Sequence, residues 1–402
     1  MTNLPQGWKM ETLGEILSSD KYSIKRGPFG SALKKSFFVE KGIRIFEQYN
    51  PINNDPHWKR YFISHEKFQE LEAFKATEGD LLISCSGTLG KIVELPKDTE
   101  MGIINQALLK IRLNNIKILN SYFIYYFNSP IMQEKILEST LGSAIKNIAS
   151  VKILKQIEIP LPPLKEQERI VGILDESFAK IDESIKILEQ DLLNLDELMQ
   201  SALQKAFNPL KDNAKENYKL PQSWEWKSLE EISENISAGR DKPKNCTESK
   251  TAKNQIPVYA NGVNNNGLVG YTDKATIIKP SLTISARGTI GFVCIRKEPY
   301  FPIVRLISLI PCENILCLHY LYFCLNFFIA KGEGSSIPQL TIPKFKSLQI
   351  PLPPLKEQEQ IAEHLDFVFE KAKALKELYT KELKDYEELK QSLLNKAFKG
   401  EL

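Results

Sequence analysis

The ten residues Ile159-Pro-Leu-Pro-Pro-Leu-Lys-Glu-Gln-Glu168 occur twice in the chain, and the second copy runs from Ile350 to Glu359. Ten identical residues do not recur by chance, so the chain contains an internal duplication. The copies stay in step afterwards, because Lys205-Ala-Phe207 and Lys396-Ala-Phe398 lie at the same offset of 191 residues. A period this long is not that of a solenoid, and it indicates two large modules that each end in the same element.

Paired prolines suit the start of a helix, and the residues after each copy are patterned as one. Apolar side chains alternate at spacings of three and four, which is typical of a coiled-coil seam. The first helix is predicted over Leu164–Phe207, a length of about 66 Å at 1.5 Å per residue. The second is predicted over Leu355–Phe398, where Lys376 and Lys390 interrupt the apolar pattern. The predicted seam residues are Leu174, Phe178, Ile181, Ile185, Leu188, Leu192 and Leu195 in the first helix and Leu365, Leu375, Tyr379, Tyr386 and Leu393 in the second.

The segments that precede the two helices match each other faintly. Ile83-Ser-Cys-Ser-Gly-Thr-Leu-Gly90 corresponds to Ile284-Ser-Ala-Arg-Gly-Thr-Ile-Gly291, and Gly142-Ser-Ala-Ile145 corresponds to Gly334-Ser-Ser-Ile337. Between such anchors the two modules differ freely. A shared scaffold with divergent loops is the arrangement expected of two recognition modules with different targets.

Connectivity then predicts an α+β fold, in which two pseudo-repeated mixed α/β modules are held apart by two long antiparallel helices that form a coiled coil. A short polar linker joins the end of the first helix to the second module, which runs directly into the second helix. Those two points must therefore lie close together, and this makes the helices antiparallel. The predicted segments are a first module over residues 1–158, the first helix and linker over 159–216, a second module over 217–349 and the second helix over 350–402.

The composition fits a soluble protein of the cytoplasm. Of 402 residues, 42% are apolar and 26% are charged, and no stretch resembles a signal peptide or reaches the length of a membrane span. The six cysteines form no Cys-x-x-Cys pair, which favours buried thiols in a reducing compartment over a metal site. The net charge is only +3, but the modules carry a basic excess and the helices are acidic. The modules, rather than the helices, are therefore expected to meet a polyanion.

The combination resembles the specificity (S) subunit of type I restriction–modification enzymes over essentially the whole chain. The resemblance rests on the two proline-rich segments, on the two Ser-x-x-Gly-Thr-x-Gly loops and on Gly27-Pro-Phe-Gly-Ser-Ala-Leu33. It implies that each module is a target recognition domain for one half of a bipartite, asymmetric site in double-stranded DNA. It also implies that the helices set the half-site spacing and dock two methyltransferase (M) subunits, to which two restriction (R) subunits can be added. S-adenosylmethionine, ATP and magnesium are then expected on those partners, and no cofactor or metal on this chain.

The absence of recognisable catalytic motifs favours a non-catalytic chain. Leu89-Gly-Lys91 lacks the preceding glycine and the hydroxyl residue of a phosphate loop, and no methyltransferase or nuclease motif stands out. Two other functions remain open. A coiled-coil scaffold that touches only protein would show no salt-sensitive DNA binding, and a self-sufficient nuclease or methyltransferase would be active as the purified chain alone.

Residues that could contact DNA are predicted in the loops of both modules, because Lys and Arg neutralise phosphates, Arg can fork onto guanine and Asn onto adenine. The two glycine loops are explained equally well by tight turns or by a close backbone approach to phosphate, with the Thr88 or Thr289 hydroxyl donating. Ser86 in one loop stands where Arg287 stands in the other, as a different base choice would require. The remaining candidates are Lys25, Arg26, Lys34, Lys35, Lys59 and Arg60 in the first module and Arg240, Lys242, Lys244, Lys250, Lys253, Asn264, Asn265 and Asn266 in the second.

Polar residues near the start of each helix are candidate contacts for a partner subunit. They are Glu166, Gln167, Glu357 and Gln358. Capping of the helix by the same side chains is an equally good explanation.

Overall fold

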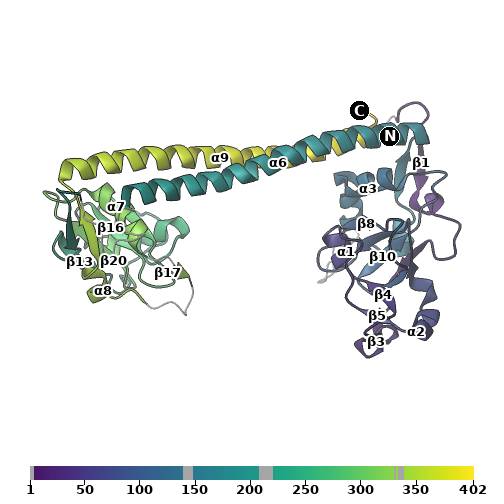
Figure 1. Ribbon diagram of the computed structural model, residues 1–402, viewed down its shortest axis with the longest axis horizontal. Helices are drawn as coiled ribbons and strands as arrows, with labels where there is room; N and C mark the ends of the chain where they lie inside the picture. The colour runs from purple at the N-terminus through teal and green to yellow at the C-terminus, as the bar shows by residue number, and fades with distance from the viewer. Residues whose placement is uncertain (1–3, 139–147, 208–220, 330–331, 334–338) are drawn as a thin grey trace. The chain divides into compact units, whose positions relative to one another are not determined.

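The computed structural model describes residues 4–138, 148–207, 221–329, 332–333 and 339–402. Contacts divide the chain into two compact units, Met1–Leu188 with Lys381–Leu402 and Glu189–Thr380. Each unit contains one module together with part of each long helix (Figure 1). The predicted linker after Phe207 and both Gly-Ser segments lie outside the described residues.

The first module is a mixed α/β structure, and its main core lies between a four-stranded sheet and helix α3. Its first strand, β1 (Lys9–Thr12), pairs antiparallel with the proline-rich strand β11 (Glu158–Leu161). The four-stranded sheet has the order β2 (Ile24–Arg26), β10 (Leu108–Ile111), β7 (Leu81–Ser84), β8 (Ile92–Glu94), and a five-stranded sheet has the order β3 (Phe38–Val39), β5 (Phe62–Ile63), β4 (Ile43–Phe46), β9 (Gly102–Ile104), β6 (Lys75–Ala76). The α-helices are α1 (Tyr49–Ile52), α2 (His65–Glu70), α3 (Asn120–Asn128), α4 (Pro130–Glu138) and α5 (Val151–Leu154).

The second module repeats this plan. Its first strand, β12 (Glu225–Ser228), pairs antiparallel with the second proline-rich strand, β22 (Gln349–Leu352). A four-stranded sheet has the order β13 (Ser233–Ala238), β20 (Ile307–Pro311), β16 (Ser281–Ile284), β18 (Val293–Arg296), a three-stranded sheet has the order β15 (Leu268–Thr272), β14 (Ile256–Tyr259), β19 (Phe301–Pro302), and β17 (Thr289–Ile290) pairs with β21 (Gly332–Glu333). The α-helices are α7 (Leu318–Phe328) and α8 (Ile342–Lys346).

The shared strand order shows that the duplication inferred from sequence extends to the modules. The parallel pair β4 and β9 of the first module has its counterpart in the parallel pair β14 and β19 of the second. Tyr122 and Tyr320 also play the same part, because each hydroxyl donates a 2.8 Å hydrogen bond to a carbonyl of the adjacent proline-rich strand, at Pro160 and Pro351.

The glutamines at the start of the two long helices correct one prediction. Gln167 in α6 (Leu164–Phe207) and Gln358 in α9 (Leu355–Lys399) are fully buried instead of facing a partner. Each amide oxygen accepts from the backbone N–H just before the module's helix, at Leu119 and at Cys317. Each amide nitrogen donates to two backbone carbonyls, one of them in the proline-rich segment. Both glutamines therefore lock a helix to its own module.

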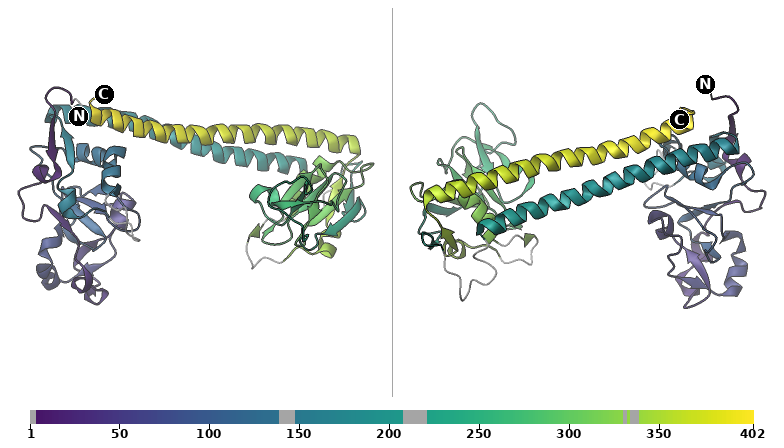
Figure 2. Two further views of the ribbon diagram at one scale, coloured as in Figure 1. Left: turned by 180° about the vertical axis from the view of Figure 1, so that it is seen from behind. Right: turned by 45° about the horizontal axis from the view of Figure 1, so that its top comes forward.

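In each unit, segments of α6 and α9 lie side by side in opposite directions (Figure 2). Leu174 of α6 shares a core with Ala397 of α9 in the first unit, and Leu203 shares one with Leu365 in the second. The predicted antiparallel pairing is thus confirmed within each unit. Phe398, at the end of α9, packs under α3 of the first module, and Phe207, at the end of α6, packs against α7 of the second.

The seam of α9 differs from the prediction at Leu375, whose surface is 38% exposed. The spacing of three and four that starts at buried Leu365 passes through Lys376 and Lys390 instead. Lys376 forms an ion pair with Asp196 of α6 in the second unit, and Lys390 forms one with Asp182 in the first. Because the lysine stems are mostly buried, the two helices tolerate cations inside an otherwise apolar seam.

Replacing Lys376 and Lys390 together with methionine is expected to raise the free energy of unfolding by about 1–4 kcal/mol. The lysine side chains are 27% and 17% exposed, whereas their aspartate partners are more than 60% exposed and stay hydrated when the lysines are lost. Denaturant titration of the full chain measures the change. Lys384→Met, at a site where the side chain is 77% exposed, is the matched control and should have little effect. A net loss of stability in the double variant would show that the ion pairs stabilise the seam.

Candidate nucleic-acid interface

In the first module, the carboxyl ends of β4, β7 and β9 meet at one edge. The loops that follow these strands are joined there by backbone hydrogen bonds, from Asn105 N to Phe46 O at 3.0 Å and from Cys85 N to Ala107 O at 2.8 Å. The Ser86 hydroxyl lies 3.4 Å from the Gln48 side-chain oxygen and can donate to it. Residues from three separate strands are thereby brought to one place, which we call the strand edge.

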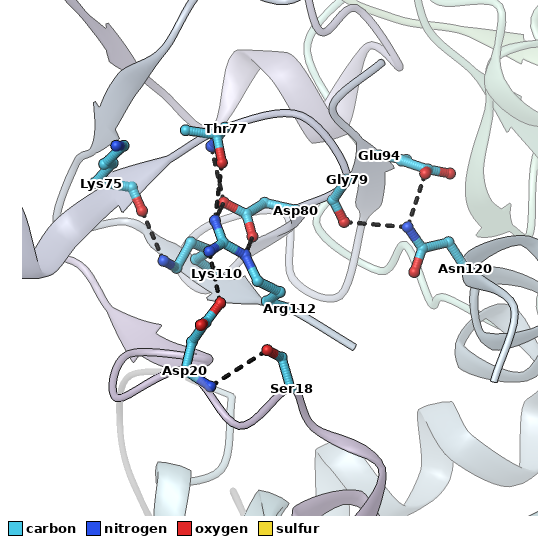
Figure 3. Close-up of polar contacts among 10 residues, drawn as sticks. All are labelled: Ser18, Asp20, Lys75, Thr77, Gly79, Asp80, Glu94, Lys110, Arg112 and Asn120. Atoms are coloured by element: carbon cyan, nitrogen blue, oxygen red, sulfur yellow. Dashed lines mark hydrogen bonds and ion pairs between the residues drawn. The ribbon is translucent and has the colours of Figure 1, made fainter. Parts of the chain in front are cut away.

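At the opposite end of the four-stranded sheet, charged side chains form a network of ion pairs and hydrogen bonds (Figure 3). Asp80 precedes β7 and is fully buried, and both of its oxygens accept from the Arg112 guanidinium at 2.7 and 2.8 Å. Arg112 also donates to Asp20 and to Thr77, each at 2.8 Å, and this contact holds the pKa of Asp20 below its ordinary value. The network fixes β7 and β10 relative to each other and so steadies the strand edge at their other ends.

The second module has an equivalent strand edge after β14, β16 and β19. Asn261 connects its loops, because its amide nitrogen donates to Val304 O at 2.6 Å and its oxygen accepts from Ala286 N at 2.8 Å. The segment after β13 joins them through Val304 N, which donates to Arg240 O at 2.9 Å. This edge places the exposed residues Arg240, Arg287 and Arg305 on adjoining loops.

The two glycine loops are tight turns at these edges. Gly87 and Gly288 have φ of +66° and +69°, which favours glycine, so the turn explanation is confirmed for both. Thr88 is exposed and remains a candidate donor. Thr289 corrects the prediction, because it lies in β17 and its hydroxyl oxygen is buried without a hydrogen-bond partner among the described residues. It cannot reach a phosphate from that position.

The basic candidates of the first module separate into two groups. Lys25 and Arg26 were expected in a loop but belong to strand β2, where the ammonium of Lys25 lies 5.2 Å from the centre of the Phe74 ring and Arg26 donates to the Ile148 carbonyl. The remaining candidates are exposed: Lys34, Lys35, Lys59 and Arg60. Of these, Lys59 forms a 3.0 Å ion pair with Glu100, and Arg60 lies over the Tyr61 ring.

Arg60 also acts on the electrostatics of the strand edge. Burial raises the pKa of Glu47, and the positive charge of Arg60 lowers it again in part. Glu47 directly precedes Gln48 at the strand edge. Burial and the charge of Arg60 therefore act on Glu47 in opposite directions beside the strand edge.

Apart from Arg287, the basic and amide candidates of the second module lie on two loops, and all of them are exposed. The loop after β13 carries Arg240, Lys242, Lys244, Lys250 and Lys253. The loop between β14 and β15 carries Asn264, Asn265 and Asn266 in a short 3-10 turn, where Asn265 and Asn266 both have φ of +52°. Asparagine tolerates this conformation better than other residues with a side chain, which is a local reason for the asparagine run.

The strand edges also contain residues that the sequence did not single out. Gln48 and Gln106 stand at the first edge, and Asn261 and Arg305 at the second. They follow strands of only two to four residues, and they lie far apart in the chain. Their position two or three residues after the end of a short strand was the available signal.

The glutamates at the helix starts are not positioned alike. Glu166 forms an ion pair with Arg169 at 2.7 Å, whereas a Glu357 oxygen accepts from the Trp224 indole N–H at 3.1 Å. Within the described ranges no three His, Cys, Asp or Glu side chains gather as metal ligands would. No described helix combines the length and apolar character needed to cross a membrane.

Comparison with known proteins gives a consistent family. The family described as "Type I restriction modification DNA specificity domain" matches residues 5–192 and 221–384. A Mycoplasma pneumoniae protein that carries the name of a type I specificity subunit is 33% identical over 221 residues, 54% of this chain and 56% of the relative. The specificity subunit of the type I restriction enzyme MjaVIII from Methanocaldococcus jannaschii is 25% identical over 81% of this chain and 79% of the relative. This chain thus spans about half the length of the first of these relatives.

Solved structures agree on the fold. A chain from a study of complex assembly and conformational transition of the type I R-M system superimposes with a TM-score of 0.81, at 21% identity and full coverage of both chains. The HsdS subunit of Thermoanaerobacter tengcongensis superimposes with a TM-score of 0.64, at 20% identity, over 99% of this chain and 98% of that one. At these identities the likeness concerns the fold alone.

Proposed function

Because this chain belongs to the family of the type I restriction modification DNA specificity domain, we propose that it is the sequence-recognition subunit of a type I restriction–modification complex. Each module reads one half of a bipartite, asymmetric site in double-stranded DNA. The observation that carries this proposal is the pair of equivalent strand edges. They share backbone connections but present different side chains, Ser86 at one and Arg287 at the other.

Mapping of methylated bases across the host genome, with and without the gene, tests the proposal. Loss of one split, asymmetric methylated motif is the expected result. An unchanged set of motifs, with the methyltransferase partner expressed, would contradict it. The salt dependence of DNA binding separates this function from a protein-only scaffold, because each phosphate contact adds about −0.9 to the slope of log K against log salt, whereas a scaffold has no such slope.

We expect two copies of a methyltransferase subunit to dock on the long helices. Support comes from exposed apolar residues outside the seam, which recur at the repeat offset. Ile187 of α6 is equivalent to Leu378 of α9, and Leu198 is equivalent to Leu389, with exposures between 44% and 61%. Exposed apolar groups that recur in both repeats suit two copies of the same partner. Replacing Ile187 and Leu378 with aspartate should weaken both contacts alike in a pull-down.

The chemistry is assigned to those partners. Methylation needs S-adenosylmethionine and a base flipped out of the duplex, and restriction needs ATP and magnesium, so this non-catalytic chain would bind none of these cofactors. Restriction subunits are the further partners expected in such an assembly. The cytoplasm is the proposed location, and the six free cysteines are consistent with a reducing compartment.

Insertion of one heptad into both helices tests whether helix length sets the half-site spacing. The matching places are between Gln190 and Asp191 and between Lys381 and Glu382. Gln190 follows Asp182 by eight residues and Glu382 precedes Lys390 by eight, so both insertions lie at the same distance along the helices from the Asp182–Lys390 ion pair. Seven residues add about 10.5 Å. The spacer between half-sites should lengthen by about three base pairs at 3.4 Å each, with both half-sites unchanged. The control is an insertion of seven residues in α6 alone, which breaks the register between the two helices. A change in the half-site sequences caused by the double insertion would contradict the proposal that helix length sets the spacing.

A further inference from the structure

The strand edge of the second module holds three arginines on segments that are separate in sequence. Arg240 follows β13, Arg287 follows β16 and Arg305 follows β19. All three are exposed, and none forms an ion pair with a carboxylate of the described residues. Three unpaired cations on adjoining loops repel one another, so a nearby anion or a strong hydrogen-bond acceptor would stabilise the arrangement.

Backbone contacts hold these three loops in fixed positions. Asn261 bonds both to Ala286, next to Arg287, and to Val304, next to Arg305. The segments around Arg240 and Ile303 form a parallel bridge, and a Cβ on Gly239 would lie only 2.8 Å from the Ile303 backbone. The arginine side chains therefore start from a rigid base, as a recognition site requires.

The turn that carries Arg305 is strained. Val304 and Arg305 have φ of +53° and +63° in succession. This conformation is unfavourable for side chains with a Cβ, above all for a β-branched valine. Neighbouring hydrogen bonds maintain it, from Val304 N to Arg240 O and from Arg305 N to Gly239 O. Strain kept in this way is typical of functional sites.

The first module shows what the same positions look like without arginine. The hydrogen bonds of Gly27 to Leu108 and of Gly239 to Leu306 are equivalent, which aligns Pro28 with Arg240. The same comparison aligns Ala107 with Arg305 and Ser86 with Arg287. Phosphates recur along any DNA, so a residue that binds only phosphate would be needed equally in both modules. In the first module, uncharged residues stand at all three arginine positions. This difference indicates that the arginines make sequence-dependent contacts.

We propose that Arg287 and Arg305, with Arg240 beside them, form a guanine-recognition site in the second module. An arginine fork can donate two hydrogen bonds to guanine O6 and N7 in the major groove. The half-site read by the second module therefore contains guanine, whereas the first module recognises its half without arginine at the equivalent positions. This inference rests on the proposed function of the chain.

The test uses the full chain co-produced with its methyltransferase subunit, and methylation motifs are mapped for each variant. Arg305→Lys keeps the charge but loses the fork, so it should reduce discrimination at one guanine of one half-site by about 5- to 150-fold, with the other half unchanged. Arg287→Lys should do the same at a neighbouring position. Lys274→Ala, an exposed cation that follows the far end of β15, is the matched control and should leave the motif intact.

The outcomes are distinguishable. If the gene's removal changes no motif, the proposed function itself fails. If the wild-type motif is present but both arginine variants methylate it with unaltered preference, the guanine site is wrong. If each Arg305 variant, Arg305→Lys or Arg305→Ala, weakens methylation to the same extent at all DNA sequences, Arg305 binds phosphate. The proposal is then overturned as well. Retention of the first half-site in each variant shows that the chain is folded.

Discussion

Replacing Phe398 with alanine is expected to lower the stability of the first unit by about 3–5 kcal/mol. Phe398 is 3% exposed, and its ring lies 5.4 Å from that of Tyr122 and 5.0 Å from that of Tyr126, in edge-to-face contact with both. Alanine would leave a cavity where the end of α9 meets the first module. The module would then lose both its core packing and its hold on the second long helix.

Hydrogen exchange followed by mass spectrometry measures this effect for each unit separately. Peptides from β1, β11 and α3 should lose protection, whereas those from the second module should not. Phe367→Ala is the matched control, because this phenylalanine of the same helix is 61% exposed and its loss should change stability by less than about 0.5 kcal/mol. Phe207→Ala should give the mirror result, with the loss confined to the second unit. Equal loss in both units from either variant would contradict this assignment.

Replacing Asp80 with alanine is expected to cost about 3 kcal/mol, and the loss should again fall on the first unit. Asp80 is buried, and its removal takes away two hydrogen bonds from Arg112 and one from the backbone N–H of Thr77. A guanidinium would remain in a partly buried site without its main counter-ion. Because Arg112 is 31% exposed, water would solvate part of this charge, and the lower end of the range for buried pairs applies.

Denaturant titration of Asp80→Ala, beside the double variant Asp80→Leu with Arg112→Met, separates the two contributions. The double variant removes both charges together, so it should recover a large part of the stability that the single variant loses. Asp98→Ala is the control, because its carboxylate is 76% exposed and lies in the same module. A single variant as stable as the wild type would show that the network does not hold the sheet. Weakened DNA discrimination by the first module alone would follow from a loosened strand edge.

The duplication and the long helices could be predicted because their signals are local and repeated. A helix that buries one stripe must place an apolar residue there every three or four positions, and this pattern adds up over many turns. The one wrong seam residue, Leu375, shows the limit of that rule. Leucine is the more apolar residue, so Leu375 was predicted in the seam. The spacing of three and four set by the seam residues on both sides passes through Lys376 instead.

The glutamines at the helix starts show a second limit. Gln167 and Gln358 are polar residues on helices, so a solvent-exposed position was the natural expectation. Each is buried because backbone groups of the module need hydrogen-bond partners there, and no pattern within the helix records that need.

The sequence by itself determined the repeat, the two long helices, their antiparallel pairing and the family, since each follows from periodicity, connectivity or a contiguous motif. Only the tertiary structure decided which side chains stand together at the strand edges. Gln48, Ser86 and Gln106 meet at one edge, and Arg240, Arg287 and Arg305 at the other, across tens of residues of intervening chain. Strand order and hydrogen-bond register bring them together. Both are set by packing between segments distant in sequence, which leaves no periodic trace in the sequence of either segment.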